Sequence, residues 1–394
     1  MSLDDLVVRC NIKMGESVHN EAPDGTPIDP KLMRIQRTTN PRPKVPQKEL
    51  VFGKVFSDHM LEIDWDYKNV RKEGGWHPPV ISAYHPLSLS PAASVLHYAL
   101  ECFEGMKAYK DVCGRLRLFR PELNMQRLNS SLARLYMPSV DPDAFIECIK
   151  ELVRQDRDWV PEGIGYSIYL RPTAISTYPF LGVGATKEIK LFCIMSPVGP
   201  YYPEGFNPIK LYADTLNVRA WPGGVGNTKV GGNYGPTIRP QMEATRLGCA
   251  QVLWLGEDHT VTEVGAMNVF FFWVNEQGEK ELITAPLCRG DVLPGVTRRS
   301  ILELAGKWRE FKVTERAVGM KEVVKAKNEG RLLEAFGAGT AVVVCPIRAI
   351  LYEEEDVVVI KEGDDVGPLT KRMWDALTDI QYGKFDHPWS VLID

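Results

Sequence analysis

Gly223-Gly-Val-Gly-Asn-Thr-Lys229-Val-Gly-Gly-Asn-Tyr-Gly-Pro236 is the stretch of sequence on which the interpretation of the whole chain depends. It places one lysine in a run of glycines, with the hydroxyl of Tyr234 five residues later. Glycine lets a backbone turn sharply and come close to a ligand, so Lys229 is poorly placed for a solvated surface role. The stretch is compatible with a lysine that grips phosphate, with a lysine that reacts as an amine, and with an ordinary surface turn.

The phosphate-binding loop of nucleotide-binding proteins requires Gly-Lys-Ser/Thr after a strand. Here Thr228 precedes the lysine and Val230 follows it, so that pattern is absent. A lysine whose pKa is lowered by burial becomes a nucleophile toward carbonyl groups. The reactive amine therefore remains as the ligand-directed interpretation, beside the ordinary glycine-rich turn.

Composition sets broad limits on the rest of the molecule. The 394 residues are enough for two domains, and 44% hydrophobic with 25% charged residues is ordinary for a soluble globular protein. A net charge of -4 argues against broad electrostatic binding of nucleic acid. No apolar run approaches the roughly 20 residues that span a bilayer, so we expect no membrane segment.

The eight cysteines show neither Cys-x-x-Cys spacing nor a metal-ligand pattern with histidine. We therefore expect no metal site, and reduced thiols in a cytosol-like compartment. The N-terminus, Met1-Ser-Leu-Asp-Asp, has no apolar region of the secretory type. Together these features predict a location in the cytoplasm or the mitochondrial matrix, without a secretory or transmembrane segment.

The first half of the chain predicts an extended arm followed by a small α/β domain. Residues 1–49 are polar and interrupted by prolines, which predicts an arm lying on the body, and residues 50–198 form the domain. Residues 94–103 have helical spacing of apolar side chains. Segments 106–109 and 115–119 predict a hairpin, and a helix should run from Pro121 to about Leu135.

The second half, residues 209–394, is richer in strand signals and follows a glycine- and proline-bearing connection over 199–208. Strand clusters mixed with helices predict an α/β (α+β) fold, and barrel-like closure of this half is compatible with the pattern. The sequence thus predicts a smaller N-terminal domain, an interdomain loop and a larger C-terminal domain.

A reactive lysine that forms an imine serves a carbonyl substrate or a pyridoxal phosphate cofactor. The cofactor requires a phosphate site, a carboxylate at the pyridine nitrogen and a donor near its phenolic oxygen. Arg120, at a predicted strand-to-helix junction, could present its guanidinium to phosphate, although the local sequence alone favours a surface arginine. In 290–297, the N–H groups of Val296 and Thr297 would open a helix and could bind an anion; an ordinary capped helix is the alternative.

Glu263 lies between valines in Thr262-Glu-Val-Gly-Ala-Met-Asn268 and would be partly buried. A buried carboxylate needs a charged or hydrogen-bonding partner, which a pyridinium N–H would supply, whereas an edge-strand glutamate would face water. Gly337-Ala-Gly-Thr-Ala341 lacks the spacing of a dinucleotide fingerprint. A backbone site for a carboxylate suits this turn better.

Six blocks in order give the chain its resemblance to a known family. They are Phe103-Glu-Gly-Met-Lys-Ala-Tyr109, Arg117-Leu-Phe-Arg-Pro121, Gly224-Val-Gly-Asn-Thr-Lys-Val-Gly-Gly-Asn-Tyr-Gly-Pro236, Thr262-Glu-Val-Gly-Ala-Met-Asn268, Leu293-Pro-Gly-Val-Thr297 and Gly337-Ala-Gly-Thr-Ala341. The chain resembles the branched-chain amino acid aminotransferases, the eukaryotic-type members most closely, from about residue 50 to the C-terminus. A single block would be weak, but six blocks in the expected order are specific.

The resemblance implies the fold-type IV pyridoxal phosphate architecture, with a larger C-terminal pseudo-barrel domain, in a homodimer. It assigns the imine linkage to Lys229, the pyridine nitrogen to Glu263 and the hydroxyl beside the phenolic oxygen to Tyr234. The further residues that it implies are Arg120, Arg219, Val296 and Thr297 for phosphate, Thr340 for cofactor and substrate, Phe52, Tyr98, Phe103, Tyr169 and Tyr201 for the substrate side chain, Ala341 for the substrate carboxylate, and Arg171 for selection of the second substrate.

The implied reaction is a ping-pong transamination between L-leucine, L-isoleucine or L-valine and 2-oxoglutarate, which yields branched 2-oxo acids and L-glutamate. Rivals that share the fold are D-amino acid aminotransferases, (R)-amine transaminases and aminodeoxychorismate lyases. A non-enzymatic phosphate-binding module is the rival of another class. Mammalian members carry a Cys-x-x-Cys redox pair after the Gly-Thr-Ala turn, but here Val342 takes the first position and only Cys345 remains.

Overall fold

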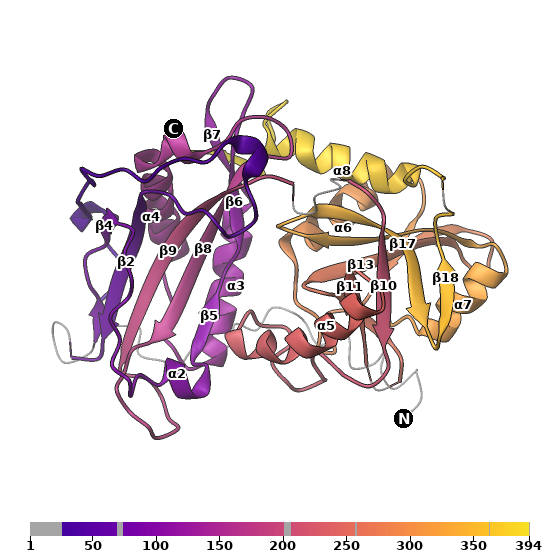
Figure 1. Cartoon of the computed structure of the whole chain (residues 1–394), viewed down its shortest axis with the longest axis horizontal. Helices are drawn as coiled ribbons and strands as arrows, with labels where there is room; N and C mark the ends of the chain where they lie inside the picture. Colours follow the sequence, from indigo (N-terminus) through magenta and orange to yellow (C-terminus); the bar gives the residue numbers. More distant parts are fainter. Residues whose placement is uncertain (1–25, 69–73, 201–205, 257, 362, 394) are drawn as a thin grey trace.

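The computed structural model describes residues 26–68, 74–200, 206–256, 258–361 and 363–393, and the strands in these ranges form two sheets. Figure 1 shows the two sheets in two lobes that lie side by side. The first sheet has ten strands in the order β1-β4-β2-β9-β8-β6-β7-β19, with β3 beside β2 and β5 beside β8. Its strands are β1 (Arg34–Ile35), β2 (His59–Asp66), β3 (Gly75–Trp76), β4 (Val80–Ala83), β5 (Glu101–Phe103), β6 (Met106–Lys110), β7 (Leu116–Phe119), β8 (Ser167–Ser176), β9 (Glu188–Val198) and β19 (Ser390–Leu392).

One face of this sheet is covered by α3 (Pro121–Arg134) and α4 (Pro142–Gln155), as Figure 1 shows. Apolar side chains at helical spacing in α3, such as Met125, Leu128 and Leu132, pack into the core with the strands. The predicted hairpin is confirmed by the pairing of β6 with β7, and the helix predicted from Pro121 is confirmed as α3.

The helix predicted over 94–103 is wrong. The structure has the single turn α2 (Val95–Tyr98), which ends at Ala99 in a left-handed conformation with φ 48°. The chain then enters β5, which pairs with β8. These residues form a strand despite the helical spacing of their apolar side chains, because pairing with β8 is a tertiary contact that local periodicity cannot indicate.

The second sheet closes on itself. Neighbouring strands follow the order β12-β11-β10-β17-β16-β13, and β13 also pairs with β12, so these six strands form a ring. The α/β (α+β) class and the barrel-like second half that the sequence indicated are therefore confirmed. The strands of this sheet are β10 (Ile209–Asp214), β11 (Gln251–Leu255), β12 (Val261–Val264), β13 (Met267–Val274), β14 (Lys280–Thr284), β15 (Lys312–Glu315), β16 (Leu332–Gly339), β17 (Val343–Tyr352) and β18 (Glu355–Val358).

Four helices accompany the second sheet: α5 (Ile238–Arg246), α6 (Val296–Trp308), α7 (Met320–Asn328) and α8 (Pro368–Gln381). The short 3-10 turns are Pro30–Leu32, Gln47–Glu49, Arg157–Trp159, Gly231–Asn233 and Gly235–Thr237. Buried side chains of α6 and α8 share one apolar cluster with Tyr109 and Phe119 of the first lobe. The two lobes are thus joined by packed side chains as well as by the chain.

The domain limits drawn from sequence stay a prediction, and residues 1–25 and 201–205 lie outside the described part of the chain. Within the described arm, β1 runs parallel to β4, and Ile28 is buried in the core of the first lobe. The terminal strand β19 pairs with β7, so the end of the chain returns to the first sheet. In the described ranges, no helix combines the length and apolar character needed to cross a bilayer.

The described cysteines depart from expectation at one position. Among the described residues, the cysteines that form no disulfide are Cys102, Cys113, Cys148, Cys193, Cys249 and Cys345. Cys288, by contrast, is disulfide-bonded. The expectation of reduced thiols throughout is therefore wrong at Cys288.

Candidate active site

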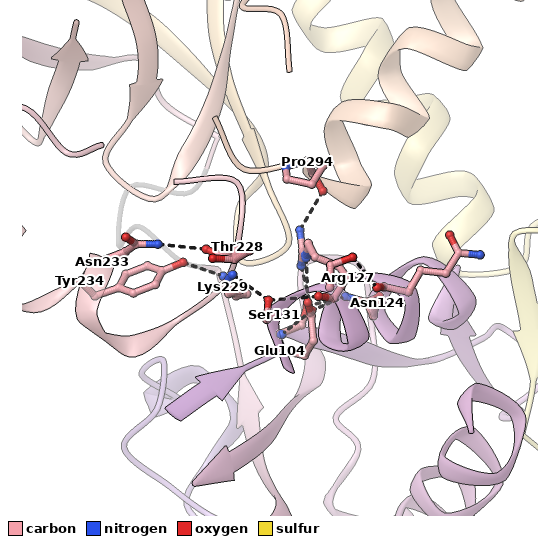
Figure 2. Close-up of polar contacts among 12 residues, drawn as sticks. Glu104, Asn124, Arg127, Ser131, Thr228, Lys229, Asn233, Tyr234 and Pro294 are labelled. Atoms are coloured by element: carbon pink, nitrogen blue, oxygen red, sulfur yellow. Dashed lines mark hydrogen bonds and ion pairs between the residues drawn. The ribbon is translucent and has the colours of Figure 1, made fainter. Parts of the chain in front are cut away.

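The backbone around Lys229 is held between β5 and α3 of the first lobe (Figure 2). The backbone N–H of Lys229 donates to Oγ of Ser131 at 2.9 Å, and the N–H of Phe103 donates to its carbonyl oxygen at 3.0 Å. A Cβ at Gly231 would lie 1.8 Å from a carboxylate oxygen of Glu101. A side chain at position 231 would therefore displace the carboxylate of Glu101. Within the segment Thr228, Val230 and Asn233 are buried, so its central part is packed against the first lobe.

The amine of Lys229 meets a hydroxyl and an aromatic ring. Its Nζ donates to the hydroxyl of Tyr234 at 3.1 Å and lies 4.7 Å from the ring centroid of Phe103. Burial, and then the positive charge of Arg127, lower the pKa of Lys229 to about 8. Burial raises the pKa of Tyr234 to about 12, so this phenol keeps its proton. The site holds an amine that is partly neutral near physiological pH.

Glu263 on β12 is a buried carboxylate, with 2% of its surface exposed, which rules out the alternative of an edge-strand glutamate facing water. One oxygen accepts the backbone N–H of Leu293 at 2.6 Å, and the other lies 3.1 Å from Nε of Arg219. Burial raises the pKa of Glu263, while Arg219 and the Leu293 N–H oppose that rise. The carboxyl group can therefore take a further donor in a site that excludes water.

Arg219 lies on the Glu263 side of the site. Besides Glu263, its guanidinium donates to the carbonyl oxygens of Gly226 and Asp291, each at 3.1 Å. These contacts orient Glu263 and tie the Lys229 segment to the loop before α6. In the structure, Arg219 thus belongs to the site through its ion pair with the carboxylate of Glu263. The phosphate contact that the resemblance implied stays a prediction.

Arg127 is the cation that the sequence reasoning missed. It projects from α3 beside Lys229, and Nε and Nη2 donate to the two oxygens of Glu104 at 2.7 and 2.8 Å (Figure 2). Its Nη1 donates at 3.1 Å to the carbonyl oxygen of Pro294, just before α6. Glu104 is fully buried and also accepts the side-chain amide of Asn124. The guanidinium is therefore fixed at the point where the two lobes meet.

Arg120, by contrast, is not brought to the lysine. Its guanidinium donates to Ser300 and to Glu303 on α6, and it stacks on the ring of Trp389 at 4.2 Å. The resemblance implied a phosphate contact for Arg120, whereas the local sequence alone favoured a surface arginine. In the structure these contacts occupy Arg120, so Arg127 replaces it as the candidate phosphate ligand.

The N-terminus of α6 lies next to Arg127, whose Nη1 donates to the carbonyl oxygen of Pro294. Its N-cap residue, Gly295, provides no side-chain cap, and Val296 and Thr297 are buried in the first turn. A Cβ at Gly295 would lie 2.1 Å from Oδ1 of Asn268, whose amide nitrogen donates to the carbonyl oxygen of Leu293. Helix N-termini bind anions through free N–H groups and the helix dipole. The first turn of α6, beside Arg127, could therefore bind a phosphate.

Aromatic residues predicted for the substrate pocket gather on the first sheet. The rings of Phe52 and Tyr169 are 4.8 Å apart, and those of Phe103 and Tyr234 are 5.0 Å apart. The guanidinium of Arg171 lies 4.6 Å from the centroid of Phe103 and donates to the hydroxyl of Tyr169 at 3.1 Å. These contacts place an apolar wall and one cation next to Lys229.

The remaining predicted residues lie in three places. Thr340 and Ala341 form the turn between β16 and β17. Tyr98 is 39% exposed and donates its hydroxyl to the carbonyl oxygen of Leu181, away from the Lys229 cluster. Tyr201 lies outside the described residues. The roles predicted for these four residues stay predictions.

Comparison with known proteins decides the family. The family model for amino-transferase class IV matches residues 101–350. The chain is 56% identical over 362 residues to a branched-chain-amino-acid aminotransferase of Dictyostelium discoideum, covering 91% of this chain and 94% of that protein. It is 48% identical over 366 residues to the mitochondrial enzyme of Rattus norvegicus, covering 92% and 91%. The chain belongs to the branched-chain-amino-acid aminotransferases.

Solved structures show the same fold. The branched-chain amino acid aminotransferase of Escherichia coli aligns with a TM-score of 0.68 at 24% identity, over 80% of this chain and 97% of that chain. The holo-form of the Thermobaculum terrenum enzyme, solved in its PLP-form, aligns with a TM-score of 0.64 at 22% identity, over 84% and 98%. The fold-type IV architecture that the resemblance implied is therefore confirmed.

The residues present in this aminotransferase fit pyridoxal phosphate. Glu263 offers a buried carboxylate for a pyridinium N–H, and Tyr234 a protonated hydroxyl for a phenolic oxygen. Arg127 and the uncapped start of α6 offer charge and N–H groups for the phosphate. Lys229 supplies the amine. Each polar group of the cofactor thus has a chemically matched partner in the chain.

Proposed function

We propose that this aminotransferase binds pyridoxal phosphate and moves the amino group of L-leucine, L-isoleucine or L-valine to 2-oxoglutarate in a ping-pong reaction. The products are branched 2-oxo acids and L-glutamate. The observation that carries the proposal is the amine of Lys229, buried beside the hydroxyl of Tyr234 with a pKa lowered to about 8. Family membership at 56% identity supports the same reaction.

When bound, the cofactor supplies an electron-withdrawing ring that stabilises negative charge at the substrate α-carbon. The chain's own residues would act on this group. Glu263 would hold a proton on the pyridine nitrogen, and Arg219 holds Glu263 in place through an ion pair. The neutral amine of Lys229 would accept the proton that leaves the α-carbon, because a pKa of about 8 leaves part of the amine neutral near physiological pH. Arg127 and the first turn of α6 would hold the phosphate.

The pocket can accept both substrates in turn. Phe52, Phe103 and Tyr169 present apolar surface to a branched side chain, and full burial of such a side chain contributes roughly 1.5–3 kcal/mol. The guanidinium of Arg171 lies over Phe103 and offers a partner for the distal carboxylate of 2-oxoglutarate or glutamate. Thr340 and Ala341 would bind the α-carboxylate that both substrates share.

Replacing the central lysine tests the proposal directly. Lys229→Ala should abolish transamination and the visible absorbance of lysine-bound cofactor, since no other group supplies that amine. Lys110→Ala is the matched control, because Lys110 forms an exposed ion pair with Glu162 and should leave both properties unchanged. Absorbance spectra and leucine-dependent glutamate formation are the measurements. Persistence of both in Lys229→Ala would overturn the assignment.

The amino donor separates the proposal from rivals with the same fold. Initial rates with a panel of L- and D-amino acids and (R)-amines, each with 2-oxoglutarate, should be highest with L-leucine, L-isoleucine and L-valine. A preference for D-amino acids or (R)-amines would assign a different reaction to the same site. Binding of ATP by a colourless purified protein would instead support the non-enzymatic phosphate-binding alternative.

We further propose a homodimer, in the cytoplasm or the mitochondrial matrix. Exposed apolar side chains on α2, the loop after β8 and α5 support association with a second apolar surface: Leu96, Phe180, Leu181, Val183, Ile238 and Met242. Cytosolic and mitochondrial relatives support the two compartments. Analytical ultracentrifugation should give twice the monomer mass, and a monomer at micromolar concentration would contradict the dimer.

A further inference from the structure

Lys107 is a second buried lysine, and the reaction proposed above does not use it. It lies on β6, with 6% of its surface exposed, and burial lowers the pKa of its amine to about 8. Its Nζ donates to the carbonyl oxygen of Ala341 at 2.7 Å. In the described part of the chain, Lys107 forms no ion pair with a carboxylate. A buried amine without a counter-charge costs folding free energy, so its retention calls for a functional reason.

The turn that Lys107 contacts has an unfavourable backbone. Residues 340–342 connect β16 to β17, and Val343, the first residue of β17, has a φ of 64°. Three-residue hairpin loops often end on a residue in this left-handed region, and glycine usually takes the position. A β-branched valine there is strained, and such strain persists only where the surroundings hold the backbone in place.

A cavity of about 290 Å³ lies next to this turn, and the described residues that line it include Lys107, Tyr109, Ala341, Val343, Gln381 and Tyr382. A cavity provides fewer packing contacts than a filled core to resist displacement of the turn. The hydrogen bond from Lys107 therefore reaches the turn from the same side as the cavity. It also crosses from the first lobe to the second, since β6 and the turn belong to different sheets.

We propose that Lys107 is a positioning residue that holds the strained 340–343 turn in the conformation that binds the substrate carboxylate. The inference rests on the proposed function, in which Thr340 and Ala341 bind that carboxylate. Donation to the carbonyl oxygen of Ala341 fixes one peptide plane of the turn. The neighbouring N–H and hydroxyl groups are thereby kept in one arrangement before the substrate arrives. In this role Lys107 acts through the turn and not directly on the substrate or the cofactor.

A positioning role and a purely structural role predict different effects of Lys107→Met. Methionine has a similar length and no charge, and an apolar replacement of a buried charge is often neutral or stabilising. The positioning role therefore predicts an unchanged or higher melting temperature, normal cofactor content and weaker binding of carboxylates. A structural role predicts a lower melting temperature and loss of cofactor together with the loss of binding.

The experiment uses the holoenzyme and 4-methylvaleric acid, a leucine-shaped carboxylic acid that has been crystallised with a solved relative. The acid lacks an amino group and cannot react, so its binding is read from the cofactor spectrum. For Lys107→Met we expect Kd to rise about tenfold, the scale of a hydrogen bond from a charged donor. KM for L-leucine should rise by a similar factor, while kcat changes less than about twofold.

Two further variants decide the outcome. Lys110→Met on the same strand should leave Kd unchanged, because Lys110 contacts the exposed Glu162. Lys107→Gln keeps an N–H donor without the charge and should give a Kd between those of the wild type and Lys107→Met. A Kd within twofold of wild type in both Lys107 variants would overturn the inference. Failure of the wild-type holoenzyme itself to bind the acid or to transaminate L-leucine would instead overturn the proposed function.

Discussion

Arg120 is the N-cap residue of α3, and Arg127 lies about two turns further along that helix. Each pairs with a glutamate, yet the two pairs differ in the burial of the glutamate. Glu303, the partner of Arg120, has a third of its side chain exposed, and Trp389 covers the guanidinium. Glu104, the partner of Arg127, is fully buried, and the pair lies between Lys229 and the loop before α6. An arginine–glutamate pair at a surface contributes little to stability, whereas a buried pair is costly to break. Both arginines are buried and both contact the second lobe, so the comparison teaches that burial of the carboxylate partner, and its place beside Lys229, distinguish the Arg127 pair.

The largest effect is expected when the buried carboxylate of the Arg127 pair is neutralised. Glu104→Gln leaves Arg127 buried without a counter-charge, which should lower the free energy of unfolding of the apoenzyme by about 3 kcal/mol or more. Pyridoxal phosphate brings an anion to the same place, so it should raise the melting temperature more in the variant than in the wild type. Glu303→Gln is the control and should cost about 1 kcal/mol or less. The free energy of unfolding is measured by denaturant unfolding, and equal losses in the two variants would contradict the stated difference between the two ion pairs.

A second effect concerns the cofactor phosphate. Arg127→Lys keeps the positive charge but loses the planar fork that donates to Glu104 and Pro294 at once. We expect the Kd of the apoenzyme for pyridoxal phosphate to rise about tenfold to a hundredfold, from the loss of about 1.5–3 kcal/mol. Arg120→Lys should leave that Kd within twofold. Titration of apoenzyme followed by absorbance measures both values, and the reverse ranking would restore Arg120 as the phosphate ligand.

A smaller effect is expected on the pH dependence of reconstitution. Attack on the cofactor requires the neutral amine of Lys229, so the rate should fall as pH drops below the lysine pKa of about 8. The charge of Glu104 raises that pKa, so Glu104→Gln should shift the midpoint of the rate profile to lower pH. Glu303→Gln should not shift it. Stopped-flow rates from pH 6 to 10 check this, and a wild-type midpoint near the ordinary value of 10.5 would contradict the burial of the amine.

The smallest effect is expected for Arg120→Ala. Arg120 and Trp389 are buried, but the carboxylate of Glu303 is 34% exposed, and we expect each contact to contribute about 1 kcal/mol or less. The variant should lose about 1–2 kcal/mol of stability in denaturant unfolding. Its kcat and KM for L-leucine should stay within twofold of wild type. A large loss of kcat would place Arg120 in the chemistry after all.

The parts of the site that could be predicted from sequence are those with unusual local chemistry. Glycines on both sides of Lys229, a hydroxyl five residues later and a glutamate between valines are rare enough to indicate partners of one site. The structure brings Lys229, Tyr234 and Glu263 into one electrostatic neighbourhood. The placement of Pro121 likewise predicts the helix that begins there, and the strand signals of the second half predict its high strand content.

The parts that could not be predicted depend on distant contacts. Arg127 lies inside an amphipathic helix, where an arginine ordinarily faces water, but it is buried because it donates to the carboxylate of Glu104, 23 residues earlier, and to the carbonyl oxygen of Pro294. The segment after Ala99 has helical spacing but pairs with β8, more than 70 residues later. Closure of the barrel also requires the pairing of β10 with β17, two strands that lie far apart in the sequence, and local periodicity indicates each of them only as a separate strand.

The return of β19 to β7 governs the order in which the molecule can be completed. Residues 390–392 supply the neighbour of β7, and the carbonyl oxygen of Ile393 accepts the guanidinium of Arg154 on α4. A chain emerging from the ribosome must therefore finish its second lobe before the edge of its first sheet is covered. Until then β7 presents unpaired backbone groups, the kind of edge that recruits other strands. Loss of the last few residues would thus harm the lobe built from the start of the chain.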